Sequence, residues 1–281
     1  MATPNPLLAR LTLVEVEVHS RCNRKCWFCP NSFICRDGPA ELLPEDVYLR
    51  LLADLADANW HGTLSFSRYN EPFAVDVFYR RLRQAHEALP DATLHTNTNG
   101  DYLTPHALAK ATDAGLATLC VQLYVPAGPW TAKACKARLA EISERLPGIR
   151  WKHHSAGIGR CEYRTSYQGL DMRARGRDFA ATGTNRCGLD VTKPYTRTAA
   201  CRVPSSGAFI DYSGHVMPCC NLRSDYPDHA AYSLGVLTAE AGSLAAILAS
   251  PKATAWRTAG LTGPPPGKPC LACRFATRGG S

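Results

Sequence analysis

Segments of strand length and of helix length alternate through the first half of this 281-residue chain. The apolar pattern predicts strands at 11–18, 63–67, 92–97 and 117–124, and helices at 43–58, 75–88, 105–114 and 132–145. Such alternation is typical of a parallel sheet covered by its connecting helices. We therefore expect a parallel α/β barrel. Between residues 151 and 200 the periodicity is too weak to assign elements.

Three closely spaced cysteines follow the first predicted strand. Cys22, Cys26 and Cys29 have the spacing C-x3-C-x2-C. A structural zinc site takes four protein ligands from paired Cys or His units. Three thiolates in one loop can instead hold three irons of a [4Fe–4S] cube and leave the fourth open to a small molecule. The pattern favours such a cluster over a zinc site, a redox loop or three unrelated core thiols.

This loop, with Phe28 directly before Cys29, resembles the cysteine loop of the radical S-adenosylmethionine (SAM) enzymes. The resemblance implies a partial (β/α)6 barrel similar to a TIM barrel. It implies that SAM binds the open iron and lies against Phe28. Reductive cleavage of SAM would give a 5′-deoxyadenosyl radical that removes a hydrogen atom from the substrate, with electrons from a donor such as flavodoxin or ferredoxin.

Polar residues follow the next two strands, where the carboxyl ends of a parallel barrel gather the chemistry. Tyr69, Asn70 and Glu71 stand in a segment that resembles the Gly-Gly-Glu-Pro motif of the family, which holds the amino group of SAM. Asn70 replaces a glycine of that motif. Thr98 and Asn99 suit contacts with the ribose and carboxylate, but such a segment is also an ordinary turn. We expect all five to bind the cofactor.

A second set of cysteines lies towards the C-terminus and contains Cys201, Cys219, Cys270 and Cys273. A hairpin with its turn at 213–214 is predicted between the first two. The arrangement resembles the twitch domain, a short SPASM-like extension of radical SAM enzymes, built from a β-hairpin and a helix. It implies a second [4Fe–4S] cluster on these four thiolates, with a structural zinc as the alternative. The expected units are a barrel at 1–165, a connecting segment at 166–200 and a twitch domain at 201–281.

The segments 15–22, 26–32 and 98–104 resemble those of radical SAM dehydrogenases that act on 2-deoxy-scyllo-inosamine. The resemblance implies an aminocyclitol or aminoglycoside substrate. In these dehydrogenases an arginine upstream of the auxiliary cysteines contacts the substrate. Arg173 is the expected counterpart, and Arg175 and Arg177 are the alternatives.

Glu15 and Glu17 share one side of the first predicted strand, because side chains alternate between the faces of a strand. Both carboxylates then point into the barrel, where an unpaired charge is costly. An ammonium group of the substrate is one candidate partner. An internal ion pair with Arg68, or a role in holding SAM, explains them equally well.

Cys220 departs from the dehydrogenase pattern, because a thiol directly follows an expected cluster ligand. Radical SAM aminoglycoside epimerases use a cysteine to return a hydrogen atom to the substrate radical. The alternatives are that Cys220 ligates the cluster in place of Cys219, or has no role. Cys120, on the fourth strand, is a rival donor or a packing residue. The remaining cysteines are expected to be structural: Cys35, Cys135, Cys161 and Cys187.

Composition agrees with an enzyme that acts on small molecules. The chain is 45% hydrophobic and 20% charged, which argues against disorder, and its net charge of +8 comes from dispersed residues. Thirteen cysteines without a secretory or membrane-spanning segment indicate metal ligation and a cytoplasmic location, with neither nucleic acid nor membrane as partner. We expect aminoglycoside epimerisation with Cys220 as hydrogen donor. Aminocyclitol dehydrogenation is the main alternative, and peptide modification or a non-enzymatic metal-binding module are weaker ones.

Overall fold

The computed structural model describes residues 5–125, 130–189, 196–240, 242–264 and 268–273; the outermost ends of the expected units, 1–4 and 274–281, lie outside them. Within these residues the strands form one sheet in the order β10-β9-β8-β1-β2-β3-β4-β7-β6-β5. Their bounds are β1 Leu13–Val16, β2 Thr63–Ser65, β3 Thr93–Thr98, β4 Thr118–Gln122, β5 Lys152–Gly157, β6 Arg160–Tyr167, β7 Leu170–Arg177, β8 Gly207–Ile210, β9 His215–Met217 and β10 Gly235–Val236.

The middle of the sheet is parallel. Strands β8, β1, β2, β3, β4 and β7 pair in parallel, with Leu13 of β1 opposite both Thr63 of β2 and Gly207 of β8. Antiparallel strands extend the sheet at both sides, β6 and β5 beyond β7, and β9 and β10 beyond β8. The expected α/β class, with a core of six parallel strands, is confirmed.

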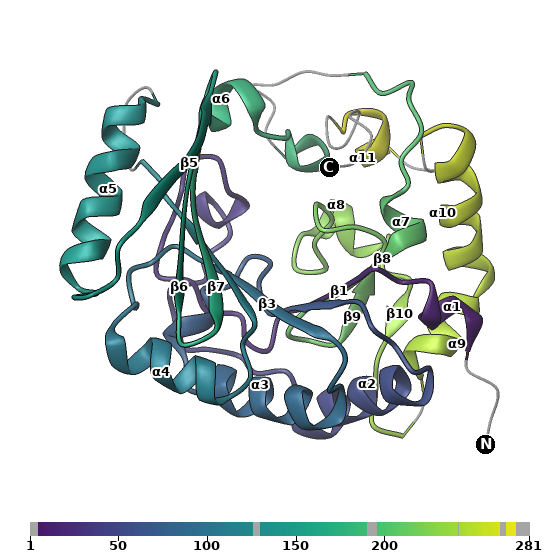
Figure 1. Ribbon diagram of the computed structural model, residues 1–281. Helices are drawn as coiled ribbons and strands as arrows, with labels where there is room; N and C mark the ends of the chain where they lie inside the picture. Colours follow the sequence, from purple (N-terminus) through teal and green to yellow (C-terminus); the bar gives the residue numbers. More distant parts are fainter. Residues whose placement is uncertain (1–4, 126–129, 190–195, 241, 265–267, 274–281) are drawn as a thin grey trace.

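Three helices connect the first four strands and lie along one face of the sheet (Figure 1). They are α2 Glu45–Asp57, α3 Val77–Ala88 and α4 Pro105–Asp113. Acidic Glu45 and Asp46 in the first turn of α2 complement the positive end of the helix dipole. The Thr104 hydroxyl caps α4 by accepting the Ala107 N–H, so this helix begins where the sequence predicts.

The other helices are shorter or lie outside the parallel core. Helix α5 covers the β6–β7 side, and α10 packs against α7. Their bounds are α1 Pro6–Ala9, α5 Ala132–Glu144, α6 Phe179–Thr182, α7 Val203–Ser206, α8 Pro227–Ala230, α9 Leu244–Ala249, α10 Pro251–Thr262 and α11 Lys268–Leu271; the 3-10 turns are η1 Pro30–Ser32, η2 Pro72–Ala74 and η3 Arg186–Gly188.

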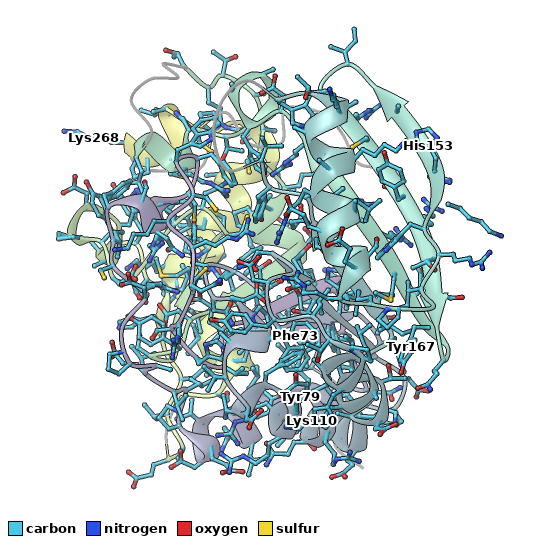
Figure 2. All side chains as sticks on the ribbon, turned by 90° about the vertical axis from the view of Figure 1, so that its left-hand side faces the viewer. Phe73, Tyr79, Lys110, His153, Tyr167 and Lys268 are labelled. Carbon is cyan, nitrogen blue, oxygen red and sulfur yellow. The ribbon has the colours of Figure 1, made fainter. Side chains whose placement is uncertain are left out.

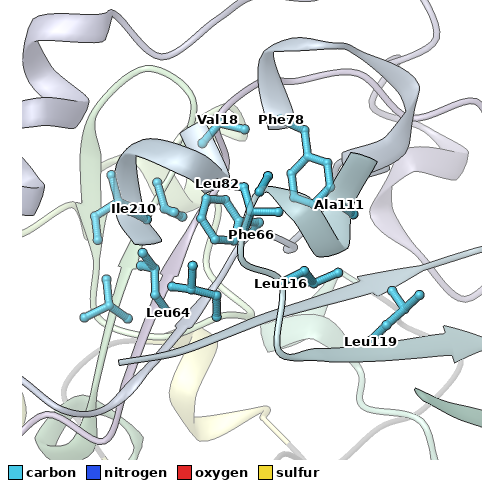
Figure 3. Close-up of a cluster of buried hydrophobic side chains, with 14 of the residues drawn as sticks. Val18, Leu64, Phe66, Phe78, Leu82, Ala111, Leu116, Leu119 and Ile210 are labelled. Carbon is cyan, nitrogen blue, oxygen red and sulfur yellow. The ribbon is translucent and has the colours of Figure 1, made fainter. Parts of the chain in front are cut away.

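The core lies between the sheet and helices α2 to α4. Figure 3 shows Phe66, at the end of β2, against Leu82 and near Phe78, both of α3. Val14, Val16 and Val18 also face this core and are fully buried. Full burial of each such side chain contributes about 1.5–3 kcal/mol. The opposite side chains of β1 are thereby directed towards the inside of the barrel.

Residues 151–177, where no elements could be assigned from sequence, form the β5–β6–β7 antiparallel unit. Its strands project from the parallel core, with His153 and Tyr167 at different heights of its edge in Figure 2. The expected boundary at residue 165 falls inside β6, where Thr165 pairs with Met172 of β7. The barrel therefore continues through β7, because that strand also pairs with β4.

The predicted hairpin is present as β8 and β9. Gly214 at its turn has φ +83°, a conformation that glycine adopts without strain, and the Asp211 carboxylate accepts the N–H groups of Ser213 and His215. Because β8 also pairs with β1, the C-terminal region continues the barrel sheet. This continuity brings the second set of cysteines up to the mouth of the barrel.

Candidate active site

A cavity of about 1190 Å³ lies at the carboxyl ends of the parallel strands. One wall holds the cysteine loop and the polar strand ends of β2 and β3. A second wall is formed by β6 and β7, and a third by the turns that carry Arg186 and Cys220. This volume exceeds the roughly 300–1,000 Å³ that is usual for a site that binds one small molecule, so the cavity can hold a cofactor and a substrate together.

The thiols of Cys22, Cys26 and Cys29 all face this cavity. The loop is fixed because the Cys22 N–H donates to the Arg36 carbonyl and the Cys29 N–H to the Cys26 carbonyl, both at 2.8 Å. Burial raises the pKa of the Cys22 thiol to about 11 and that of Cys26 to about 12. Three sulfurs directed into an open cavity fit a cluster that leaves one iron accessible.

An ionic network fastens the cysteine loop to the end of β3. Asp101 pairs with Arg24 of the loop and with Arg138 of α5, each at 2.5 Å. The Asn99 side-chain amide donates to Oδ1 of the Asn23 side chain at 2.8 Å. These pairs are mostly shielded, and they lower the pKa of Asp101 to about 2 although burial opposes the shift. The loop is thereby held at the cavity rim before any cofactor binds.

Glu71, Thr98 and Asn99 are brought together by the adjacent ends of β2 and β3. The Glu71 carboxylate accepts the Thr98 hydroxyl at 2.6 Å and the Asn99 N–H at 2.7 Å. Burial nevertheless raises the pKa of Glu71 to about 7. All three line the cavity beside the cysteine loop, which is the arrangement expected of residues that hold the amino group and ribose of SAM.

Tyr69, Asn70 and Phe28 also line the cavity. The Tyr69 hydroxyl donates to the Cys220 carbonyl at 2.9 Å, so it supports the far wall. Asn70 accepts the Arg68 N–H at 3.1 Å and so fixes the turn in which it replaces a glycine. Phe28 stacks on the Phe179 ring at 3.7 Å between centroids and forms an apolar surface beside the thiols.

The two carboxylates of β1 have different environments. Glu17 is fully buried and binds Arg36 at 2.6 Å and the Tyr69 N–H at 2.8 Å, so it does not face the cavity. Burial raises the pKa of Glu17, but the adjacent arginines outweigh burial and hold the pKa below its usual range. Of the explanations left open for Glu17, the structure therefore shows the internal ion pair, formed with Arg36 and, at 3.9 Å, with Arg68.

Glu15 does face the cavity. The nearest cation, Arg68, is 3.7 Å away, and Glu15 Oε1 has no hydrogen-bond partner among the described residues. Burial raises the pKa of Glu15 to about 8, against the opposing effect of Arg68. Glu15 is thus a carboxyl group that can gain or lose a proton near neutral pH.

Arg173, the expected substrate contact, does not line the cavity in the structure. Its guanidinium binds Asp171, two residues earlier on the same strand, at 3.0 Å. Arg175 and Arg177 share its face of β7 and do reach the cavity, as does Arg186. Burial and the neighbouring Arg186 lower the pKa of Arg177. Arg186 was missed because it lies where the sequence has no usable periodicity.

Cys220 lines the same cavity as the three thiols of the cysteine loop. Burial, reinforced by nearby Glu15, raises the pKa of its thiol well above the usual value. The rival donor Cys120 is buried in β4 and accepts a hydrogen bond from Gln122 at 3.3 Å, and it does not line the cavity. Cys220 is therefore the better placed of these two thiols to meet a substrate.

A second, smaller cavity, called here the sulfur cavity, lies on the other side of the wall that carries Arg186 and Cys220. It is lined by Cys201, Cys219, Cys270 and Cys273, the four expected auxiliary ligands, and also by Cys187. These thiols come from four separate segments of the chain, which favours a shared group at their centre. Arg197 lines the same cavity and donates to the Cys273 carbonyl at 3.0 Å, which places a cation beside the sulfurs.

The remaining cysteines have other surroundings. Cys35 is exposed and donates to Asp37 at 2.6 Å, whereas Cys135 and Cys161 belong to the apolar core beside Gly176. Cys187 differs from the expectation that it is a core thiol, because it faces the sulfur cavity. Its nearness in sequence to Cys201 was the available signal.

Comparison with known proteins identifies the two cysteine regions. The profile of the Radical SAM superfamily matches residues 16–150, and that of the SPASM iron–sulfur cluster-binding domain matches residues 201–274. The S-adenosyl-L-methionine-dependent 2-deoxy-scyllo-inosamine dehydrogenase of Niallia circulans is 30% identical over 210 residues, which are 74% of this chain and 73% of that protein.

Two solved structures have the same fold. BtrN in complex with AdoMet and 2-DOIA superimposes with a TM-score of 0.70 at 23% identity, over 95% of this chain and 94% of BtrN. BtrN in an open conformation gives a TM-score of 0.59 at 22% identity, over 95% of this chain and 92% of BtrN. Among the described residues, no helix has both the length and the apolar character needed to cross a membrane.

The two sets of thiols lie at the two cavities, and each set falls within one of the two matched regions. The expected cofactors, SAM and two iron–sulfur clusters, are confirmed. The chain belongs to the radical SAM superfamily and carries a SPASM-type domain for a second iron–sulfur cluster.

Proposed function

We propose that this enzyme oxidises a secondary alcohol of an aminocyclitol to a ketone. One observation carries the proposal: Glu15 and the Cys219–Cys220 wall of the sulfur cavity meet on one side of the active cavity. Alcohol oxidation removes a hydrogen atom, a proton and an electron, so it needs three acceptors around one carbon. The related Niallia circulans enzyme, named as a dehydrogenase of an inosamine, supports this reaction over the epimerisation expected from Cys220.

When bound, SAM with the first cluster supplies the radical that removes the carbinol hydrogen, and the auxiliary cluster accepts one electron. Glu15 is the proposed acceptor of the hydroxyl proton. Its carboxylate takes the hydroxyl proton as the C–H and O–H bonds break and the C=O bond forms. Glu15 Oε1 is buried and has no hydrogen-bond partner among the described residues, so it is available for a substrate hydroxyl.

Glu15 works as a base only when it is ionised. Its carboxyl faces Arg68, Arg186, the Glu17 carboxylate and the Cys220 thiol, and burial brings its pKa to about 8. The ionised fraction therefore increases as pH rises through about 8. A catalytic base with a pKa near the working pH is the efficient case.

Arginines of the other walls hold the substrate in this proposal. Arg175 and Arg164 both bind Glu162, at 2.8 and 2.7 Å, so this part of the wall is preorganised. Arg186 donates to Asn221 at 3.2 Å, and its Nε has no partner in the described part of the chain. Guanidinium donors from two walls of the cavity suit a ring that carries several hydroxyl groups.

Epimerisation remains a second candidate, because Cys220 lines the cavity. In that reaction the Cys220 S–H bond breaks and its hydrogen atom bonds to the substrate radical from the opposite face. The resulting thiyl must then regain an electron, through the auxiliary cluster, and a proton from solvent. The substrate formula is unchanged, which separates this outcome from oxidation.

Anaerobic turnover in deuterium oxide, over a panel of aminocyclitols and aminoglycosides, tests the proposal by mass spectrometry. Oxidation predicts a product short of two hydrogens with no carbon-bound deuterium. A product of unchanged formula with one carbon-bound deuterium would overturn it in favour of epimerisation.

Two variants test the roles proposed for Glu15 and Cys220. Glu15→Gln keeps the shape but removes the base, so ketone formation should fall by about 10²- to 10⁴-fold while 5′-deoxyadenosine still forms. Cys220→Ala is the matched change on the same wall, and it should leave ketone formation within a few fold. Full ketone formation by Glu15→Gln would exclude Glu15 as the base.

A further inference from the structure

A strained turn, η3, separates the two cavities. Arg186 and Cys187 both have positive φ, 48° and 55°, and are followed by Gly188 at 90°. A residue other than glycine in this conformation costs about 1–2 kcal/mol. Such strain persists when surrounding contacts over-determine it, and it is frequent at functional sites. The turn directs Arg186 to the active cavity and Cys187 to the sulfur cavity.

Contacts from three directions hold this turn. Asn185 donates to the Ala272 carbonyl next to Cys273. His229 of α8 donates from Nε2 to the Cys187 carbonyl at 3.3 Å. Arg186 is tied to Asn221, two residues after Cys219. Two of these three contacts, those to Ala272 and Asn221, come from segments that carry other sulfurs of the cavity.

The sulfur cavity has one thiol more than a cube requires. Four thiolates saturate a [4Fe–4S] cluster, whereas five cysteines line the cavity. The four at 201, 219, 270 and 273 lie inside the region that matches the iron–sulfur domain, and Cys187 lies outside it. The Cys187 side chain packs in one buried cluster with those of Cys219, Cys270 and Cys273, so its thiol lies among the expected ligand sulfurs.

We propose that the Cys187 S–H donates a hydrogen bond to a ligand sulfur beside it, that of Cys219 or Cys273, and that it thereby raises the reduction potential of the auxiliary cluster. A donated S–H bond disperses negative charge on a ligand sulfur. It therefore stabilises the reduced cluster, which has one more negative charge, more than the oxidised cluster. Cys187 is thus a positioning and tuning residue, and this role is independent of which substrate the enzyme oxidises.

The test measures the auxiliary cluster by itself. In the full-length chain with Cys22, Cys26 and Cys29 all changed to Ala, reconstitution leaves only the second cluster. Iron content and a potentiometric titration followed by electron paramagnetic resonance are then compared with and without further changes at 187. Cys187→Ala removes the donor, Cys187→Gly removes it and also relieves the positive φ, and Cys187→Ser keeps an O–H donor. Cys135→Ala, a buried thiol of the core, is the matched control.

Four irons per chain are expected in every variant. Cys187→Ala and Cys187→Gly should lower the midpoint potential, with about a tenfold change in the reduced-to-oxidised ratio at fixed potential, which is 59 mV for one electron. Cys187→Ser should recover most of the shift, and Cys135→Ala should show none. An unchanged potential in both donor-free variants would overturn the proposal. Loss of iron in Cys187→Ala would overturn it too, by making Cys187 a ligand.

Discussion

Replacement of Glu17 by Ala should destabilise the fold without removing a substrate contact. The Glu17 side chain is fully buried, and Arg36, its partner at 2.6 Å, has only 4% of its side chain exposed. Removing one member of a buried ion pair costs about 3–5 kcal/mol, because the other charge stays buried. Arg36 still pairs with Asp225 at 2.8 Å, which limits the loss of stability. The Tyr69 N–H, however, is left without its acceptor, which costs about 1–3 kcal/mol of stability. We expect a total near 4 kcal/mol.

Thermal unfolding of the anaerobically reconstituted enzyme measures this loss. At about 2–4 °C per kcal/mol, Glu17→Ala should lower Tm by about 10 °C. Glu17→Gln should lose less, because its amide oxygen still accepts the Tyr69 N–H. Glu87→Ala, on the exposed face of α3, is the control and should stay within about 0.5 kcal/mol of the parent. A loss below 1 kcal/mol in Glu17→Ala, together with a raised KM for substrate, would refute the structural assignment.

Three further changes test the active cavity. Cys22→Ala should abolish 5′-deoxyadenosine formation, and retained formation would contradict the assignment of the first cluster. The rate of ketone formation in the parent should rise with pH up to about 8, the pKa of Glu15, and Glu15→Gln should lose this limb; a flat profile in the parent would exclude the proposed base. Asp101→Asn removes the shared partner of Arg24 and Arg138, so it should raise the KM for SAM several-fold at little cost to kcat; an unchanged KM would show that this network does not position the loop.

Local patterns were sufficient to predict the parallel core. The alternation of Val14, Val16 and Val18 with Glu15 and Glu17 predicts which face of β1 is buried, because the side-chain period of a strand is two. The short C-x3-C-x2-C spacing predicts the first sulfur set directly, whereas the second set, spread from Cys201 to Cys273, was expected only from its resemblance to the twitch domain.

The secondary structure of residues 151–200 could not be predicted, because their hydrophobic residues do not recur with the period of a strand or a helix. All residues of β5 are exposed, so that strand has no buried face to give a period. The distinction between Glu15 and Glu17 also depends on tertiary structure. Both lie on one face of β1, and only the approach of Arg36 from a distant loop removes Glu17 from the cavity. The positive φ of Cys187 likewise has no sequence signal.

The wall between the two cavities is one peptide unit thick at two places. Arg186 faces the active cavity and its neighbour Cys187 the sulfur cavity, and Cys220 and Cys219 repeat this division. A substitution selected for a new substrate at Arg186 or Cys220 therefore displaces a sulfur on the other side of the same peptide. A substitution at this wall that changes the substrate is therefore expected to change the reduction potential of the auxiliary cluster as well. The β5–β6 unit, where His154, Arg160 and Arg164 line only the active cavity, is where this enzyme can acquire new substrates while its redox chemistry stays constant.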